Sequence, residues 1–161
     1  MTLDELNDRL TVLIDNISME AESATLKNAT AATTLMKKRV FVDGTNASGV
    51  AFTSYSRGYA LKRASKGLRT DKKNFNATNT LNTQVKAFIY DKKIFVGVQD
   101  PASKTTKSIT DGQTETLENV LLENAKREGE KIISLSSEEI KIIQEGVVKD
   151  ITKYMKITLG L

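Results

Sequence analysis

Residues 2–38 read TLDELNDRLTVLIDNISMEAESATLKNATAATTLMKK, and the fold is organised around them. The stretch opens with a capping box, in which the Thr2 hydroxyl accepts from the Glu5 backbone N–H while the Glu5 carboxylate accepts from the Thr2 N–H. Apolar and small residues, with one amide, then recur at spacings of three and four: Leu3, Leu6, Leu10, Leu13, Ile17, Ala21, Ala24, Asn28, Ala31 and Leu35. This pattern predicts one long helix over residues 1–38, with a narrow seam for another helix.

The threonine-rich run near Asn28 lowers helix propensity, so a break there is the alternative. Unbroken, the helix spans roughly 55 Å at about 1.5 Å per residue, which is longer than a compact domain of this size needs. We therefore expect its seam to pack against neighbouring copies of the chain. The expected subunit-interface residues are the large apolar ones at its N-terminal end: Leu3, Leu6, Leu10, Leu13 and Ile17.

The remainder of the chain alternates turn-rich, strand-like and helical segments. Residues 39–83 form a basic loop region, and 84–99 form a β-hairpin because two β-rich runs flank Asp91-Lys92-Lys93. The polar segment 100–115 is expected to be a mobile loop. Residues 116–156 form a helical end with two helices, the second starting at a capping box from Ser136 to Glu139. The prediction is a single α+β domain over 1–161, with a small antiparallel sheet.

Composition limits the chemistry available to this chain. Its 161 residues include no cysteine and no histidine, which excludes thiol nucleophiles, imidazole bases and Cys/His zinc sites. We expect no catalytic residue, no metal ligand and no cofactor, and hence no enzyme. The enzymatic alternative is a hydrolase with a Ser–Lys pair, formed by Ser56 with Lys62 or Lys66. No apolar run approaches a membrane span, and the acidic start differs from a signal peptide. Synthesis in the cytoplasm is the corresponding expectation.

The net charge of +4 is unevenly distributed, because residues 36–95 carry thirteen basic and only three acidic side chains. Such a block binds a polyanion, docks on an acidic partner or a second copy, or is a solvated surface. The basic residues expected to contact a partner or a channel are Lys62, Arg63, Lys66, Arg69, Lys72 and Lys73. Phe52, Tyr55 and Tyr59 precede them, either to stack nucleic-acid bases or to anchor a loop.

Residues 39–59 read RVFVDGTNASGVAFTSYSRGY, which has the form Arg-x-Phe-x-x-Gly, a short polar insert, Gly, and an apolar residue before Tyr-Ser. This block resembles the small tailed-bacteriophage neck proteins known as virion morphogenesis, tail-completion or head–tail joining proteins. Residues 74–81 are similar to a second motif of that family, with Asn79 where Gly is usual, and residues 131–136 to a third, with Ile133 where Phe is usual. The residues that carry the main motif as loop anchors are Arg39, Phe41, Gly44, Gly49, Phe52, Tyr55, Ser56 and Tyr59.

The resemblance implies a structural virion protein located in the neck. Such proteins form a six- or twelve-fold ring at the head–tail junction, contact the portal or its adaptor and the tail proteins, and surround the channel for DNA. Contacts with that DNA are transient and non-specific, and the family has no membrane partner. Head–tail connector and tail terminator both fit the pattern. The alternative is a nucleic-acid-binding regulator that uses the basic block.

Overall fold

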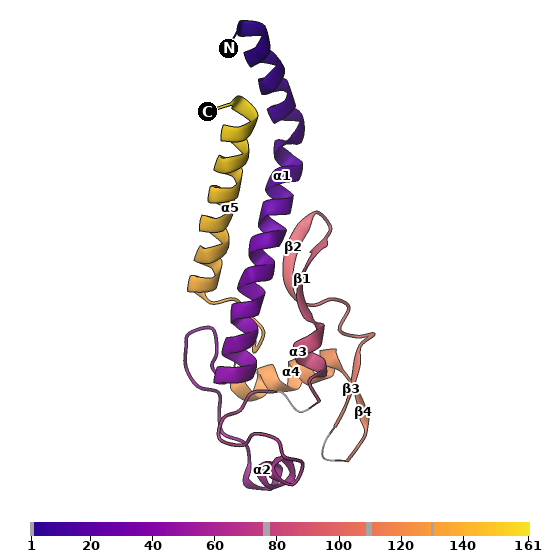
Figure 1. The fold of residues 1–161 in the computed structure, drawn as a ribbon. Coiled ribbons are helices and arrows are strands. Elements are labelled where there is room, and N and C mark those ends of the chain that lie inside the picture. The colour runs from indigo at the N-terminus through magenta and orange to yellow at the C-terminus, as the bar shows by residue number, and fades with distance from the viewer. Residues whose placement is uncertain (1, 76–77, 109–110, 130) are drawn as a thin grey trace.

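The computed structural model describes residues 2–75, 78–108, 111–129 and 131–161, which form an elongated arm on a smaller base (Figure 1). Two long helices make the arm, α1 (Leu3–Lys38) and α5 (Ser137–Leu159). The base contains the π-helical turn η1 (Arg39–Asp43) and the helices α2 (Arg57–Ala64), α3 (Thr80–Gln84) and α4 (Leu117–Glu128). Two antiparallel hairpins complete it: β1 (Val85–Tyr90) with β2 (Lys93–Val98), and β3 (Thr105–Lys107) with β4 (Thr114–Thr116).

The predicted fold class is confirmed: an α+β chain with a long N-terminal helix, an antiparallel hairpin and two C-terminal helices. The Thr2–Glu5 capping box is present, and α1 runs unbroken through Asn28. The threonine hydroxyls of this run donate to backbone carbonyls four residues back, as in Thr30 to Leu26 and Thr33 to Ala29, so they are satisfied within the continuous helix. The alternative of a break near Asn28 is therefore wrong.

Helix α5 runs antiparallel beside α1 and begins at the predicted Ser136–Glu139 capping box. The two helices approach closely at Gly146, where a Cβ atom would overlap the Asn28 Oδ1. The Asn28 side-chain amide donates to Asp150 Oδ2 at 3.0 Å, so the polar residue of the seam has a partner on the opposite helix. A single satisfied polar group in an apolar helix contact fixes the register of the two helices.

The core lies where the foot of α1 meets the first hairpin, α4 and the segment before α5. Its buried apolar side chains come from these segments and from η1, the loop after it and α3: Met36, Val40, Phe41, Phe52, Leu81, Val85, Leu117 and Ile132. Val96 and Val98 of β2 pack against this cluster, so one face of the hairpin is turned toward α1. The opposite face of the hairpin is turned outward.

Two segments differ from the sequence-based expectation. The basic region 39–83 contains η1, α2 and α3 in addition to loops, because Ser56 caps α2 through its hydroxyl and lets a helix start there. The segment 100–115, expected to be a mobile loop, contributes the hairpin formed by β3 and β4. Residues 109 and 110 of that segment lie outside the described residues, as do residues 76 and 77 of the second family-like motif.

Candidate functional site

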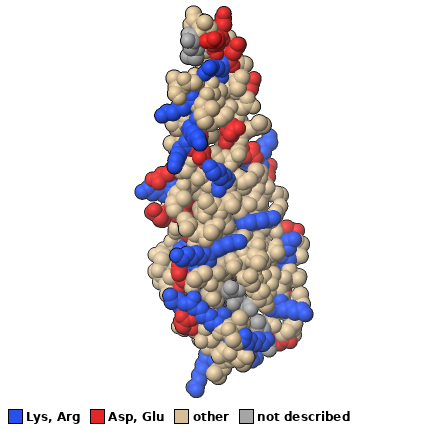
Figure 2. Space-filling model, viewed as in Figure 1, with Lys and Arg blue, Asp and Glu red and all other residues tan. Residues whose placement is uncertain are grey.

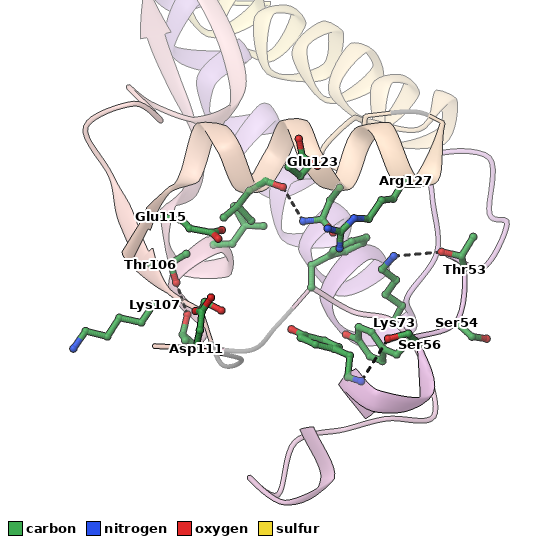
Figure 3. A pocket seen from close by; sticks show the side chains of 18 residues that line it. Thr53, Ser54, Ser56, Lys73, Thr106, Lys107, Asp111, Glu115, Glu123 and Arg127 are labelled. Carbon is green, nitrogen blue, oxygen red and sulfur yellow. Dashed lines mark hydrogen bonds between the residues drawn. The ribbon is translucent and has the colours of Figure 1, made fainter. Parts of the chain in front are cut away.

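A cavity of about 690 Å³ lies in the base between α4, the β3–β4 hairpin and the loop that leads into α2 (Figure 3). Its walls are rich in hydroxyl groups, including those of Thr53, Ser54 and Ser56. Three cationic and three anionic side chains also line it: Lys73, Lys107, Arg127, Asp111, Glu115 and Glu123. The cavity lining is therefore mixed, with polar, charged and apolar side chains.

The most buried charged pair beside this cavity joins Lys73 to Glu128, the last residue of α4. The same carboxylate accepts from the Thr53 backbone N–H at 2.9 Å and from the Thr53 hydroxyl at 2.8 Å. Burial raises the pKa of the Glu128 carboxyl, but the hydrogen bonds from Lys73 and Thr53 outweigh it, and the pKa is held below its ordinary value. The Lys73 ammonium is thus neutralised by a buried ion pair with α4, which also holds the loop before α2 through Thr53. The expectation that Lys73 contacts a partner or a channel is therefore wrong.

Arg63 is buried as well, with 1% of its surface exposed. Its guanidinium lies over the Tyr55 ring at 4.5 Å and near the Tyr59 ring at 5.9 Å. The same group donates to the Arg69 carbonyl at 2.8 Å and to Asn74 Oδ1 at 3.2 Å. The alternation of aromatic and basic residues therefore builds an internal cation–π cluster. Arg63 is not available to a partner, which corrects that expectation, and the two tyrosines anchor the loop.

The remaining predicted basic contacts divide in two. Arg69 is held by Asp71 and donates to the Val42 carbonyl, and the hydrogen bond from Arg69 lowers the pKa of the Asp71 carboxyl to about 2. Lys62, Lys66 and Lys72 are exposed. Basic side chains cross the middle and the base of the molecule in Figure 2, while acidic ones gather at the free end of the arm. The basic surface of the block is therefore smaller than its composition indicates.

Ser56 serves as the N-cap of α2, and its hydroxyl accepts from the Tyr59 N–H. Among the described residues, no hydrogen bond joins Ser56 to Lys62 or Lys66. Nor do three His, Cys, Asp or Glu side chains of the described part gather closely enough to hold a metal ion. The helices of that part include none long and apolar enough to cross a membrane.

The other family-like residues hold the loop after α1. Phe41 and Phe52 lie in the core, and the Phe52 ring meets Phe75 edge-on at 4.7 Å between centroids. Gly44 ends η1 with φ +71°, and a Cβ there would lie 2.6 Å from the Lys73 carbonyl oxygen, so the position requires glycine. Gly49 has φ +79° in open space.

Arg39 connects three segments at the junction of arm and base. Its guanidinium donates to both Glu139 carboxylate oxygens, at 2.9 and 3.1 Å. It also donates to the Ser134 carbonyl at 2.6 Å and to the Thr45 carbonyl at 3.2 Å. Because Glu139 is also the capping-box residue of α5, this one side chain ties the end of α1 to the start of α5 and to the glycine-bounded loop. Sequence spacing contained no sign of the pair, which is separated by 100 residues.

The predicted subunit-interface residues of α1 do not share one environment. Leu13 is buried at 9% exposure, in the part of α1 that α5 accompanies, and Leu6 and Ile17 are half-buried. Leu3 and Leu10 are exposed, Leu3 at 84%. The expectation that Leu13 packs against another copy is therefore wrong, because α5 folds back from Glu139, beside Arg39, to Gly160, beside Arg9. The free end of α1 extends beyond that point.

No protein-family model, curated protein or solved structure matches this chain. The functional conclusion therefore depends on the family-like motifs and on the surfaces described above.

Proposed function

We propose that this chain is a structural protein of a tailed-bacteriophage neck, and that copies of it form a ring around the DNA channel at the head–tail junction. The proposal joins two independent supports. One is the resemblance of residues 39–59 to that family. The other is the arm, which is long and projects from the base (Figure 1). It also exposes apolar side chains.

The exposed apolar residues of the arm carry the proposal. Within residues 2–19, the described start of the chain, five large apolar side chains are exposed: Leu3, Leu10, Val12, Ile14 and Met19. Helix α5 adds exposed Val148, Met155 and Ile157. Scattered apolar residues are ordinary on a monomer, but so many on one thin element mark a surface that a protein partner covers. In a ring, neighbouring copies of the chain bury these apolar side chains.

The polar side chains of the base support a structural role. The hydroxyl of Ser56 caps a helix, Lys73 and Glu128 neutralise each other, and Arg63 fills an aromatic cluster. Each group is held by bonds that stabilise the loop between α1 and α2, so none of these three sites presents an activated nucleophile or base. The exposed Lys62, Lys66 and Lys72 are suited to weak, salt-sensitive contact with DNA phosphates or with an acidic neighbour.

Native mass spectrometry and negative-stain imaging of the full chain test the proposal. Closed rings, formed by the chain alone or on addition of a portal, adaptor or tail protein, are the expected result. A monomer that stays monomeric with all of these partners contradicts it. If that monomer binds DNA with a steep salt dependence, the nucleic-acid-binding regulator replaces the neck protein. If a hydroxyl-reactive probe labels one serine of that monomer stoichiometrically, the hydrolase replaces the neck protein as the proposed function.

A further inference from the structure

The outward face of the β1–β2 hairpin is an aromatic surface. The pairing of the strands places Phe88 opposite Phe95 and Tyr90 opposite Lys93, all on the face turned away from the core. The Phe88 and Phe95 rings stack with centroids 5.9 Å apart, and Tyr90 meets Phe95 edge-on at 6.2 Å. Tyr90 is 67% exposed and Phe95 42% exposed. Aromatic side chains in such a position are the usual anchors of protein–protein contacts.

An apolar groove adjoins this surface. It has a volume of about 230 Å³ and lies between the end of β2, helix α4 and residues 131–133. Gly97 belongs to both, since it pairs with Lys86 on the outward face and also lines the groove. A Cβ on Gly97 would meet nothing within 4 Å, so the surface and the groove are continuous there. Leu122 of α4, 53% exposed, lies on the groove wall.

Four lysines lie on or beside the aromatic surface and the groove, Lys86, Lys92, Lys93 and Lys131, with one carboxylate, Asp91, in the hairpin turn. Within the described part of the chain, none of them lies within ion-pair distance of a carboxylate. We call the hairpin face, the groove and these lysines the receptor surface. It has an apolar centre and a rim of positive charge, so it is complementary to an apolar segment with acidic flanks.

The free end of α1 has that character. Leu3, Leu10 and Ile14 follow one another at helical spacings along one stripe, and all three are exposed. Asp4, Asp8 and Asp15 follow the neighbouring side of the same helix, are also exposed, and pair with no described lysine or arginine. Figure 2 shows acidic side chains at the end of the arm, with basic ones just below them. We call this segment, residues 3–15, the tip.

We propose that the tip of one copy docks on the receptor surface of the next copy. This inference rests on the proposed function, because it states which two surfaces meet in the ring. Tip against tip would bring the aspartates of two copies together, and receptor against receptor would bring the lysines together. Both two-fold contacts place like charges opposite one another, whereas tip against receptor places unlike charges around two apolar centres. Such a heterologous contact repeats from copy to copy. It closes into a ring when the rotation between neighbouring copies is a whole fraction of 360°.

Charge reversal tests the pairing. The variant Asp8→Lys/Asp15→Lys leaves the first helical turn and its capping box intact, and is expected to weaken assembly by about tenfold or more, because like charges now meet across the contact. Adding Lys92→Glu/Lys93→Glu in the same chain restores the attraction with both signs exchanged. The four-site variant is expected to assemble at nearly the wild-type concentration, as measured by analytical ultracentrifugation.

A matched control keeps the net charge of the four-site variant. In it, Lys62→Glu/Lys66→Glu on α2 replaces the two changes on the hairpin, and no recovery of assembly is expected. Recovery by this control to the same extent shows that net charge, or a contact of the tip with α2, governs assembly, and either result overturns the inference. Circular dichroism melts of every variant verify that each one is folded.

Disulfide trapping gives a second, direct readout, since the chain has no cysteine of its own. Asn7→Cys places a thiol on the tip, and Gln99→Cys places one beside the groove. Ser65→Cys, exposed at the end of α2, is the control. Equimolar mixtures of two single-cysteine chains are oxidised, and the dimers are identified by mass. The expected product joins positions 7 and 99, at least several-fold in excess over the product that joins 7 and 65.

The outcomes separate this inference from the proposed function. Rings that form while the trapped pairs are 7 with 7, or 7 with 65, overturn the tip-to-receptor contact and leave the neck protein standing. A wild-type chain that stays monomeric alone and with virion partners overturns both. Charge rescue together with the 7–99 disulfide supports both.

Discussion

Replacing Arg39 by methionine is expected to weaken the junction between arm and base. In the native protein the Arg39 side chain is 13% exposed and its partner Glu139 only 6% exposed, with the nearest pair of atoms 2.9 Å apart. Methionine keeps much of the length of the side chain but removes every donor. Glu139 then remains buried with only its capping-box bond to the Ser136 N–H at 2.8 Å, and the Ser134 and Thr45 carbonyls lose a charged donor.

Removing one partner of a largely buried ion pair costs about 3–5 kcal/mol, because the other charge stays buried without compensation. For a chain of this length, roughly 2–4 °C of melting temperature corresponds to each kcal/mol, so the expected loss is about 6–20 °C. The double variant Arg39→Met/Glu139→Gln leaves neither charge, while the glutamine side chain retains the capping box. It is expected to be more stable than Arg39→Met alone by about 1 kcal/mol or more.

Urea unfolding followed by circular dichroism, at one protein concentration for all variants, measures these free energies, since assembly makes stability depend on concentration. Lys141→Met is the matched control, because its ion pair with Glu145 is exposed and 3.8 Å long, and its loss is expected to cost under about 0.5 kcal/mol. A cost for Arg39→Met as small as that of the control refutes the role given to Arg39. Additive costs in the Arg39 and Glu139 variants refute the coupling.

Three further predictions use the same unfolding measurements. Gly44→Ala is expected to lower the free energy of unfolding more than Gly49→Ala. Both positions have positive φ, which strains alanine by about 1–2 kcal/mol, but only at position 44 does the Cβ meet a backbone oxygen. Equal losses of stability would contradict this. Gly146→Ala is expected to destabilise the fold, although helix propensity alone favours alanine by about 1 kcal/mol. The control Gly58→Ala, in open space on α2, is expected to stabilise it. A gain in stability for Gly146→Ala would show that α1 and α5 are not in close contact there. Because the folded pKa of Glu128 is lowered, its contribution to stability is present above about pH 4.3, the ordinary value for the unfolded chain, and is lost as the pH falls through the folded pKa. Glu128→Gln should therefore flatten the dependence of stability on pH below about 5, and an unchanged slope would exclude this carboxylate as its source.

Local elements were predictable from the sequence because their signals are local. The capping boxes at Thr2 and Ser136 are each completed within three residues, and both form as expected. The hairpin over residues 84–99 follows from two β-rich runs and a short turn, and its strands pair from Val85 with Val98 to Tyr90 with Lys93. The β3–β4 hairpin was not predicted, because its strands are three residues long and polar, so they carry no apolar alternation.

The candidate site was predicted less well, because composition does not tell whether a charge is exposed. Arg63, Lys73 and Lys62 look alike in the sequence, within one basic block. Arg63 is buried by Tyr59 from its own helix and by Tyr55 from the preceding loop. Lys73 is paired with Glu128, which lies 55 residues away in the sequence. Only Lys62 among the three faces solvent. The distant carboxylate has no signature that sequence spacing can detect.

The chain sequence on its own specified α1, α4, α5, the first hairpin and an acidic start followed by a basic block, since each depends on neighbours a few residues apart. The fold added the pairing of α1 with α5, which buries Leu13 and leaves Leu3, Leu10 and Ile14 exposed at the tip. A helical stripe has the same appearance in the sequence whether its cover comes from the same chain or from another. The position where α5 ends, beside Arg9, decides which apolar residues of α1 are covered by the same chain and which are left for another copy.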